Sequence, residues 1–464
     1  MNKIITNINK PLPFFSITMK IYTVGGYNEV GKNMTVVDLG EDAFMFDCGV
    51  HLPPLVEYQE SDNDKELDEN MLRNIGAVPE DTLLEDEGLR KKIRGIFASH
   101  AHLDHIGAIP YLGKRYDAEV LGTPFTMQVL KKLFEDEGIK PKNKIKKIQP
   151  NSSYKVEGKN KEYKVEFINV THSTIQASLI ALHTDEGVIL YANDFKLDNS
   201  PQVGQKPNYK ALRRIAKKGV KALIVESLYA GEERKTPSEK IAKGLLEDVL
   251  LGVENKDSGI IVTTFSSHIA RLNSIVEMGK KLDRKIVFVG RSLRKYVSSA
   301  IKEGLCPFED DVELYSYRKE REKILKKASK NKEDYLIVCT GHQGEPGSIL
   351  ERISRNDLPY NLEEGDHVIF SSSTIPVEIN RANKAQMEKR LKSRKVRIFD
   401  NVHVSGHAGR EDLRDFINMV SPEHIVPAHG DLPKISDLAE LTSEMGYKIG
   451  ENCHIMRDLQ DIEI

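Results

Sequence analysis

The sequence predicts an α/β protein in which a layered sandwich of sheets and helices is interrupted by an inserted domain with a parallel sheet. Short strands separated by glycine turns begin at Met19, and from about residue 209 buried strands alternate with helices in βαβ units. After residue 380 the strand-and-loop style of the first part returns. A chain that resumes its earlier style after a different unit indicates that the second domain is inserted into the first.

The first part of the chain combines strand patterns with one long helical pattern. Period-2 alternation and β-branched residues favour strands, whereas apolar residues at 3.6-residue spacing favour a helix. The expected elements are strands in KIYTVGG (20–26), NMTVVDLG (33–40), AFMFDCG (43–49), GIFAS (95–99), EYKVEFINV (162–170), ASLIALHT (177–184) and GVILYAND (187–194), and a helix in TPFTMQVLKKLFEDEG (123–138). They form a first domain over residues 19–208, and residues 1–18 are expected to be an N-terminal extension.

The inserted domain is predicted over residues 209–380, and the first domain resumes over residues 381–464. Strands are expected in VKALIVES (220–227), GIIVTTF (259–265), KIVFVG (285–290), DYLIVCTG (334–341) and HVIFSSS (367–373). Helices are expected in SEKIAKGLLEDVLLG (238–252), IARLNSIVEMGKKL (269–282) and VEINRANKAQMEKRLKS (377–393). This alternation predicts a parallel sheet.

Composition and charge favour an ordinary globular protein. The 464 residues are 39% apolar and 30% charged, and the net charge is -2, so no global basic field attracts nucleic acid. A polyanion would have to bind in a local groove. The acidic segment 57–90 is interpreted as a solvated helical or loop insertion and not as a catalytic carboxylate cluster, because charge runs are usually solvent-exposed.

The cysteines and the lengths of the apolar runs indicate the cellular location. The four cysteines, Cys48, Cys306, Cys339 and Cys453, are scattered without a C-x-x-C pair, which disfavours a disulfide framework and favours a reducing environment. No apolar run approaches the ~18 residues that span a bilayer, and the N-terminus is a poor signal peptide. A cytoplasmic location is therefore expected.

The most informative stretch is H-x-H-x-D-H at residues 100–105, directly after an apolar strand. It is expected to form a loop at the carboxyl end of that strand, where α/β sheets place their sites. In an extended loop His100 and His102 project the same way, Asp104 continues that face, and His105 turns out beside it. Two imidazoles beside a carboxylate–imidazole pair suit two neighbouring cations. Four ligand-type residues in six positions disfavour the alternative, a surface histidine cluster.

HAHLDH resembles the second motif of the metallo-β-lactamase superfamily, and further residues follow in the order of that family's motifs. Asp47 in FMFDCG, His172 in NVTHSTIQA and Asp194 in YANDFK are similar to its first, third and fourth motifs. A single strand-end Asp or His is more often a turn residue, but this order and spacing favour ligands. The resemblance implies an αββα sandwich that carries a hydrolytic metal centre.

The position of the last ligand narrows the resemblance. The candidates are His407, in HVSGHAG, and His429, in IVPAHGD, and His429 lies 235 residues after Asp194. Short hydrolases of the superfamily need only a few dozen residues there. The long gap resembles the β-CASP nucleases, in which an inserted domain caps the metal site and forms a nucleic-acid channel. Glu226 in IVES is then similar to their motif A, His407 to motif B and His429 to motif C.

Within that group the chain resembles the ribonuclease J family over residues 19–455. Similar stretches are VGGYNEVGKNMTVVDLG, NDFKLD, TFSSHIARL, TGHQGEPGS, FSSSTIPVE, HVSGHAG and PAHGD. Two features depart from the bacterial pattern. Ser227 and Leu228 follow Glu226, where bacterial members tend to show Asp-Ser-Thr, and the chain ends soon after the last metallo-β-lactamase segment. The chain is thus similar to the shorter archaeal type, and the bacterial mode of dimerisation is in doubt.

The resemblance implies two divalent metal ions, with Zn²⁺ expected and Mn²⁺ as the alternative, because His/Asp sites accept both. The implied ligands are His100, His102 and His172 for one ion, Asp104, His105 and His429 for the other, and Asp194 as a bridge. Asp47 would sit behind the ligands and fix their orientation. His407 is the candidate general acid for the leaving 3′ oxygen, with Glu226 orienting it and raising its pKa. The alternative for His407 is a satisfied buried histidine in a glycine loop.

Substrate contacts are expected from three segments. The loop of His403, Val404, Ser405, Gly406 and His407 resembles the family's nucleotide-binding loop. Ser371, Ser372 and Ser373 could offer hydroxyls and backbone N–H groups to a terminal phosphate, or form a serine-rich turn before Pro376. From the inserted domain, candidate backbone contacts are His268, Arg271 and Arg291. The run Tyr315, Tyr317, Arg318, Lys319 and Arg321 mixes aromatics with bases as single-strand grooves do, although mixed-charge helices are more often solvated faces.

The leading hypothesis is a metal-dependent ribonuclease that degrades single-stranded RNA 5′ to 3′ from a 5′ monophosphate, with additional endonuclease activity, in RNA decay and maturation. A homodimer and RNA-decay protein partners are expected, and membrane association is not. One alternative is an RNA-processing endonuclease or DNA-acting nuclease of the β-CASP group. A small-molecule ester, thioester or lactone hydrolase is disfavoured by the 235-residue gap, and a non-catalytic RNA-binding protein by the fact that every ligand position is filled.

Overall fold

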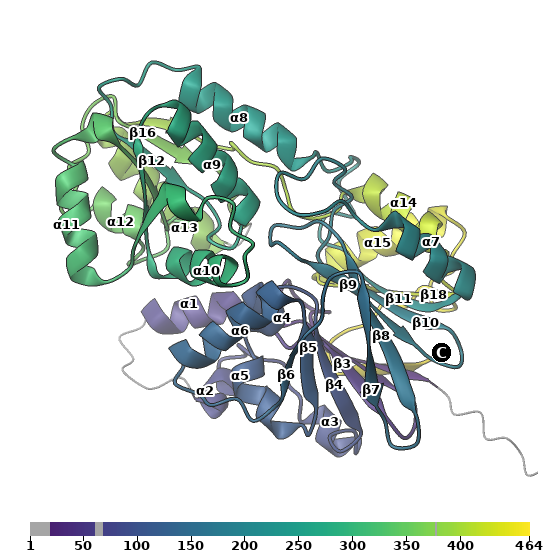
Figure 1. The fold of residues 1–464 in the computed structure, drawn as a ribbon. Coiled ribbons are helices and arrows are strands. Elements are labelled where there is room, and N and C mark those ends of the chain that lie inside the picture. The colour runs from purple at the N-terminus through teal and green to yellow at the C-terminus, as the bar shows by residue number, and fades with distance from the viewer. Residues whose placement is uncertain (1–18, 61–67, 376–377) are drawn as a thin grey trace, which may run out of the picture.

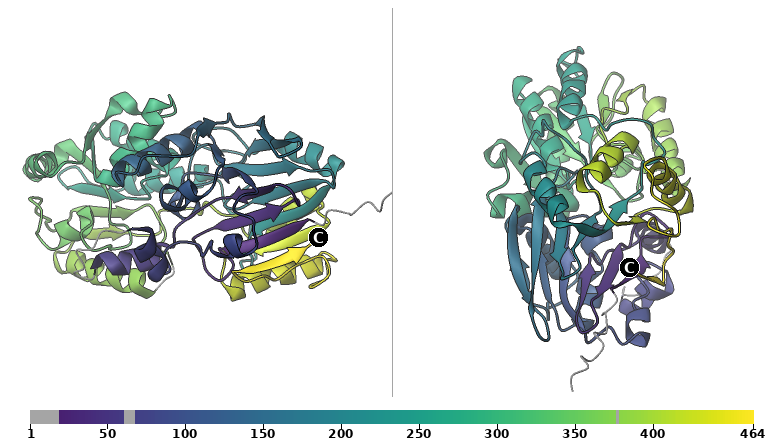
Figure 2. Two further views of the ribbon diagram at one scale, coloured as in Figure 1. Left: turned by 90° about the horizontal axis from the view of Figure 1, so that it is seen from below. Right: turned by 90° about the vertical axis from the view of Figure 1, so that its right-hand side faces the viewer.

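The chain forms two lobes, a sandwich and an inserted domain that sits over one end of it (Figure 1; two further views in Figure 2). The computed structural model describes residues 19–60, 68–375 and 378–464. The predicted N-terminal extension, residues 1–18, lies outside the described residues. Among the described residues, no helix is both long enough and apolar enough to cross a bilayer.

The sandwich is built from two sheets. The strands of the first sheet are Lys20–Gly25 (β1), Met34–Asp38 (β2), Ala43–Phe46 (β3), Ile93–Ala98 (β4), Glu119–Gly122 (β5), Ile145–Lys147 (β6) and Gln460–Glu463 (β19). Those of the second are Ser152–Glu157 (β7), Glu162–Asn169 (β8), Ser178–His183 (β9), Val188–Ala192 (β10), Val220–Glu226 (β11) and His424–Ala428 (β18). The spatial orders are β19-β1-β2-β3-β4-β5-β6 and β18-β11-β10-β9-β8-β7.

The two sheets bury large apolar side chains against each other. Phe44, Phe46 and Phe97 of the first sheet form one cluster with Phe167 and Tyr191 of the second. Alternate residues of a strand point to opposite faces, so the other side chains of the same strands meet the helices outside. The period-2 pattern of the sequence thus produces two packed layers.

Helices cover the outer faces of the sandwich. Those that follow strands of the first sheet are Leu52–Glu60 (α1), Glu69–Asn74 (α2), Leu83–Asp86 (α3), Leu103–Ile106 (α4), Ile109–Leu112 (α5) and Pro124–Asp136 (α6). Tyr209–Lys218 (α7), Arg410–Val420 (α14) and Leu432–Glu444 (α15) lie on the second sheet (Figure 1). This arrangement confirms the predicted αββα sandwich.

The acidic segment 57–90 is less solvated than expected. Residues 61–67 lie outside the described part, and the rest is largely helical. Leu72 is buried against the core, and Asp81 is buried with its carboxylate bonded to Arg73 and Tyr116. Several charges of this segment therefore form internal ion pairs and hold it against the first sheet.

The inserted domain is a parallel sheet covered by helices, as predicted. Its strands are Ile260–Thr263 (β12), Lys285–Val289 (β13), Val312–Tyr315 (β14), Tyr335–Cys339 (β15), His367–Phe370 (β16) and Arg397–Phe399 (β17), in the order β14-β13-β15-β12-β16-β17. Its helices are Glu239–Leu251 (α8), Ile269–Lys281 (α9), Arg291–Lys302 (α10), Arg318–Ala328 (α11), Ile349–Ser354 (α12) and Glu378–Ser393 (α13). Every neighbouring strand pair is parallel.

Both boundaries of the inserted domain differ from the expected 209–380. β11 pairs with β10 and β18, so it belongs to the second sheet of the sandwich. β17 pairs with β16 and forms an edge of the inserted sheet. The inserted domain therefore begins after β11 and ends with β17. The physical reason is that a short apolar strand joins whichever sheet offers it a partner, and the partner β18 follows the whole insertion in the sequence.

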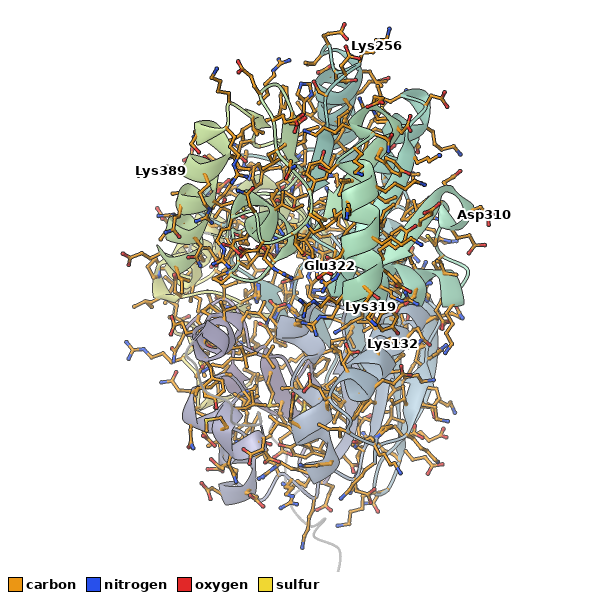
Figure 3. The ribbon with its side chains drawn as sticks, turned by 90° about the vertical axis from the view of Figure 1, so that its left-hand side faces the viewer. Lys132, Lys256, Asp310, Lys319, Glu322 and Lys389 are labelled. Carbon is orange, nitrogen blue, oxygen red and sulfur yellow. The ribbon has the colours of Figure 1, made fainter. Side chains whose placement is uncertain are left out.

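The two lobes meet along a seam between α10 and α6. The Tyr296 hydroxyl donates to the Ala101 carbonyl at 3.3 Å, and Lys295 forms an ion pair with Asp136 at 2.6 Å. Figure 3 draws Lys319 on α11 at the lower edge of the inserted domain, above Lys132 of α6. Because Ala101 lies within the HAHLDH segment, the seam passes directly over the predicted metal loop.

Candidate metal centre and catalytic site

Three of the predicted site residues adopt a left-handed backbone at or just after a strand end. Asp47 follows β3, Asp194 comes shortly after β10, and His429 follows β18, with φ of 58°, 58° and 55°. This region is uncommon for residues other than glycine and costs about 1–3 kcal/mol each, so the surrounding structure must hold it. All three side chains lie at the same end of the sandwich, where the two sheets bring their strand ends together.

The HAHLDH loop is held by two segments, one just before β2 and one just after β3. The N–H of Asn33 donates to the Asp104 carbonyl at 3.0 Å, and the N–H of Cys48 donates to the His105 carbonyl at 2.8 Å. A Cβ on Gly49 would lie 1.7 Å from the Asp104 carbonyl oxygen. Only glycine allows this approach, which fixes the path of the loop that carries four predicted ligands.

The seven side chains predicted as metal ligands come together in two groups that share Asp194. In each group one ligand atom per residue lies within 4.8 Å of the others. The first group is His100, His102, His172 and Asp194, and the second is Asp104, His105, His429 and Asp194. Asp194 Oδ2 lies 3.3 Å from His100 Nε2 and 3.2 Å from His105 Nε2, and Asp194 Oδ1 lies 3.4 Å from His429 Nε2.

Each of the five imidazoles turns one nitrogen toward its group and offers the other to a hydrogen-bond partner. In the second group, His105 Nδ1 bonds Asp47 Oδ2 at 2.7 Å and His429 Nδ1 bonds Asn33 Oδ1 at 2.9 Å. In the first group, the partners of His100 Nδ1, His102 Nε2 and His172 Nδ1 are Ser99 Oγ at 3.0 Å, Ser267 Oγ at 3.0 Å and the Gly406 carbonyl at 2.8 Å. Such partners fix the ring orientation and the tautomer of metal-binding histidines.

The electrostatics of the buried cluster also fit cations. Burial lowers the pKa of His100, His102, His172 and His429, which favours the neutral form that binds metals. Burial also opposes a charge on His105, but Asp194, Asp104 and Asp47 together raise its pKa well above the usual value. The carboxylates therefore attract positive charge into the second group.

Asp194 shows directly that the cluster fits a metal. Its Oδ1 is buried and, within the described part of the chain, has no hydrogen-bond partner. A buried carboxylate oxygen without a partner is costly unless a cation satisfies it. Imidazole nitrogens and carboxylate oxygens are the donors that Zn²⁺ and similar divalent ions accept. The residues present therefore fit divalent cations.

His407 and Glu226 form a pair beside this cluster. His407 Nδ1 donates to Glu226 Oε2 at 2.7 Å, and Glu226 Oε1 accepts from the N–H of Phe195 at 2.8 Å. Burial lowers the pKa of His407, but Glu226 and Asp194 outweigh it and raise the pKa to about 9. His407 is therefore no ordinary buried neutral histidine. Its bond to Glu226 holds the ring at the edge of the cluster, and the neighbouring carboxylates favour its protonated form.

A buried arginine, Arg271, hydrogen-bonds to the loop 403–407. Arg271 is fully buried and donates to both carboxylate oxygens of Glu239, at 2.5 and 3.0 Å. It also donates to His403 Nδ1 at 3.1 Å and to the Ser371 carbonyl at 2.9 Å. Its guanidinium was expected to contact RNA. In the structure it is instead enclosed by protein, and it positions the loop.

The other expected substrate contacts divide into buried and accessible groups. Ser371 is fully buried and its hydroxyl donates to the Val402 carbonyl, so it is part of the scaffold. His268 is buried and caps α9 through Nδ1, which accepts from the N–H of Arg271. Ser372 is buried with Oγ unpartnered among the described residues, and Ser373 is half-buried. Of these four residues, Ser372 and Ser373 keep hydroxyls with no partner among the described residues, and the expected contact Arg291 is exposed.

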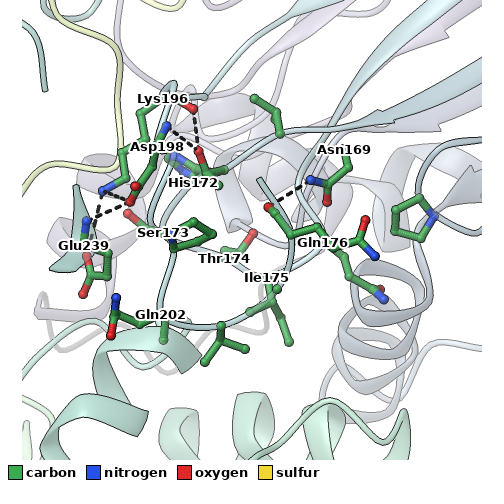
Figure 4. Close-up of a pocket in the computed structure, with 18 of the residues that line it drawn as sticks. Asn169, His172, Ser173, Thr174, Ile175, Gln176, Lys196, Asp198, Gln202 and Glu239 are labelled. Carbon is green, nitrogen blue, oxygen red and sulfur yellow. Dashed lines mark hydrogen bonds and ion pairs between the residues drawn. The ribbon is translucent and has the colours of Figure 1, made fainter. Parts of the chain in front are cut away.

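A cavity of about 280 Å³ lies next to the first ligand group, between the sandwich and the inserted domain. Its lining includes His172, Ser173 and Gln176 from the sandwich and His268 and Ala270 from the inserted domain. Figure 4 shows this cavity with Lys196 beside Asp198 and Glu239. Cavities of roughly this size are near the lower limit for small-ligand sites.

Four residues of the site were not predicted from the sequence, because they do not face the ligand groups but hydrogen-bond to side chains that do. Asn33, Ser99, Tyr191 and Ser267 bond to ligands or to Asp47. None belongs to a spacing pattern with the histidines, and serine and asparagine are common turn residues. Only Ser99 could have been found, because it directly precedes the HAHLDH motif.

Gly406→Ala should weaken zinc binding. A Cβ at this position would lie 2.0 Å from Ser173 Oγ and 3.1 Å from His172 Nδ1, so the loop must move and the His172–carbonyl bond is lost. We expect a loss of about 10–100-fold in zinc affinity, measured by competition with a chromophoric chelator. Gly244→Ala is the matched control, because a Cβ there meets nothing within 4 Å. Unchanged zinc affinity in Gly406→Ala would contradict the assignment of His172.

Comparison with known proteins agrees with this geometry. Family models match residues 27–206 ("Metallo-beta-lactamase superfamily"), residues 257–388 ("Ribonuclease J, beta-CASP domain") and residues 393–456 ("Zn-dependent metallo-hydrolase RNA specificity domain"). A crystal structure of a protein of unknown function from Enterococcus faecalis has a TM-score of 0.65 at 19% identity and covers 96% of this chain and 100% of that chain. That likeness shows the fold alone.

Curated relatives match nearly the whole chain. The ribonuclease J of Methanocaldococcus jannaschii is 40% identical over 443 residues, which cover 95% of this chain and 98% of that protein. The ribonuclease J of Pyrococcus abyssi is 41% identical over 447 residues, which cover 96% and 97%. The ribonuclease J of Helicobacter pylori is 28% identical, and the match covers 96% of this chain but 60% of that protein. The chain therefore belongs to the ribonuclease J family of metal-dependent ribonucleases.

Proposed function

We propose that this chain is a two-metal exoribonuclease that removes nucleotides from the 5′ end of single-stranded RNA, prefers a 5′ monophosphate and also cuts internally. The observation that carries the proposal is the pair of ligand groups sharing Asp194, with the His407–Glu226 pair beside them. Two adjacent cations and a protonated imidazole are groups that can catalyse phosphodiester hydrolysis.

Each of the two ligand groups would hold one ion. His100, His102 and His172 would hold one ion, Asp104, His105 and His429 the other, and Asp194 would contact both. Zn²⁺ is the proposed ion, because imidazole-rich sites favour it, and Mn²⁺ is the alternative. When bound, two such ions generate a nucleophilic hydroxide from water and neutralise the phosphodiester oxygens.

The remaining chemistry falls to the side chains. His407 is the proposed proton donor to the leaving 3′ oxygen. Its Nδ1 proton is engaged by Glu226, which leaves Nε2 for the substrate. Asp47 accepts bonds from His105, Ser99 and Tyr191, and so holds one ligand ring and the start of the metal loop in place. These residues orient groups before substrate arrives, which reduces reorganisation during the reaction.

The carboxyl edge of the inserted sheet supports an RNA substrate. Tyr317, at the start of α11, is 64% exposed, and the Arg294 guanidinium lies 5.2 Å from its ring centre. Nε of Arg321 is buried without a partner in the described part, and burial together with Arg352 and Arg291 lowers the pKa of Arg321. Crowded arginines bind phosphates, and an exposed aromatic ring stacks bases. We propose this basic cluster as the local RNA contact in a chain whose net charge is -2.

Cleavage from the 5′ end is supported by two serines, Ser372 and Ser405, that are proposed to hold a terminal phosphate. The Ser372 hydroxyl is buried and has no hydrogen-bond partner among the described residues, and the Ser405 carbonyl accepts from Lys196 at 3.2 Å. Hydroxyl and backbone N–H groups can hold a terminal phosphate, and we propose these two serines for that role. The four cysteines are free and buried, which supports a cytoplasmic setting. A homodimer and RNA-decay partners stay predictions.

The 5′ end of the substrate is the direct test of the proposed polarity. Purified protein should degrade 5′-monophosphate RNA faster than matched 5′-triphosphate and 5′-hydroxyl RNA, and release mononucleotides from the 5′ end. A 3′-labelled ladder on denaturing gels would measure this. Asp104→Ala should abolish cleavage by removing a ligand, and His407→Ala should slow it by about 10²–10⁴-fold while metal stays bound.

Equal rates on all three 5′ ends, with cuts only at internal sites, would make the protein an endonuclease instead. Metal loss in His407→Ala would show that this histidine is a ligand and not the proton donor.

The pH dependence tests the His407–Glu226 pair. A general acid acts in its protonated form, so turnover should fall as pH rises through the pKa of His407, which is about 9 in the ion-free site and lower beside bound cations. Glu226→Gln removes the carboxylate that raises this pKa. The alkaline limb of kcat should therefore move to lower pH by about one unit or more. An unmoved limb in Glu226→Gln, measured with metal and RNA saturating, would refute the role of the pair.

A further inference from the structure

The two ligand groups differ in the residues that hydrogen-bond to the ring nitrogens pointing away from each group. In the second group both partners, Asp47 and Asn33, belong to the sandwich. In the first group only His100 has a sandwich partner, Ser99. His102 and His172 are instead held by Ser267, of the inserted domain, and by Gly406, in the loop that follows it. One metal group is thus complete within the sandwich, and the other is completed by the insertion.

We infer that Ser267 is a positioning residue for the ligand His102, and that the first group binds its ion tightly only when the inserted domain is docked. This inference rests on the proposed two-metal function and adds to it that the two ions differ in their dependence on the insertion.

The first argument is the tautomer of His102. Its Nδ1 lies 3.1 Å from His100 Nε2 and 3.1 Å from His172 Nε2, so Nδ1 is the nitrogen that faces the first group. A neutral imidazole that binds through Nδ1 carries its proton on Nε2. Ser267 Oγ, 3.0 Å away, accepts a hydrogen bond from that N–H. Loss of this acceptor would free both the ring rotation and the tautomer of one ligand.

The second argument is that Ser267 itself has little freedom. It is 5% exposed and lies between β12 and α9, next to the N-cap residue His268, whose Nδ1 accepts from the N–H of Arg271 at 3.2 Å. The Arg271 side chain contacts the loop that carries Gly406, through His403 at 3.1 Å and the Val404 carbonyl at 3.4 Å. Arg271 therefore contacts both segments: its backbone N–H bonds the residue after Ser267, and its guanidinium bonds the loop that carries Gly406.

The third argument is the seam between the lobes. Tyr296 of α10 donates to the carbonyl of Ala101, the residue between His100 and His102. Lys295 on the same helix pairs with Asp136 of α6. Docking of the inserted domain thus fixes the backbone of the metal loop as well as one ligand ring. A domain that moved away would remove the contacts that hold His102 and His172, whereas Asp47 and Asn33 would still hold the two histidines of the second group.

Ser267→Ala tests the inference, with Ser266→Ala as the matched control. The two serines are adjacent, but Ser266 Oγ bonds Ser292 Oγ at 3.2 Å and touches no ligand. Zinc stoichiometry and affinity would be measured by chelator competition on the full chain without RNA. Wild type and Ser266→Ala should bind two ions with similar affinities. Ser267→Ala should keep one ion at wild-type affinity and bind the other about 10–100-fold more weakly.

Ser267→Thr, which keeps the acceptor oxygen, should restore the weakened ion. Two ions bound as in wild type by Ser267→Ala would overturn the inference, and so would an equal loss of both ions or a failure of Thr to rescue. A wild-type chain that binds fewer than two ions would instead refute the proposed two-metal function, so the two failures are distinguishable.

Discussion

The carboxylate of Asp194 is the constraint on which the rest of the structure depends. It is buried among imidazoles of both ligand groups, with one oxygen that has no hydrogen-bond partner in the described part of the chain. Burying such a charge is costly without a compensating cation. The left-handed backbone at Asp194 and the strand ends of both sheets keep it there. The sandwich can be understood as the scaffold that holds this unfavourable group in place.

The inserted domain completes this scaffold and does more than cover it. Arg271 and Glu239 form a buried ion pair, and the same guanidinium reaches the loop that precedes His407. Removing one partner of such a pair leaves an uncompensated buried charge, at a cost of about 3–5 kcal/mol. The loop that carries His407, and the contact of Gly406 with His172, are therefore held by a residue of the inserted domain. This explains why a chain that needs only a sandwich for its ligands carries the insertion between Asp194 and His429.

That the side chains of the two groups lie together could be predicted from the sequence, because most of them stand in local patterns. His100 to His105 form one motif, and Asp47, Asp194 and His429 each stand at or just after the end of a recognisable strand. The contributions of tertiary pairing could not be predicted. β11 looks like the first strand of the insertion but joins the sandwich, since its partner β18 is distant in the sequence. β17 shows the converse error at the other boundary.

Residue type alone gave a wrong prediction where burial determines what a side chain contacts. Arg271 has the chemistry of a phosphate contact, and only the structure shows that Glu239 and carbonyl groups enclose it. Ser267 lies in a motif that was noted for its resemblance, but its bond to His102 spans 165 residues and leaves no local signal.

The location of bound ions tests the central claim most directly. Crystals grown with zinc would be measured at wavelengths on both sides of the zinc absorption edge. The account predicts two anomalous peaks roughly 3.5–4 Å apart, one beside His102 and His172 and one beside His105 and His429, with Asp194 between them. A single peak, or an ion held by Asp194, Glu226 and His407 in the third group of possible ligands, would contradict it.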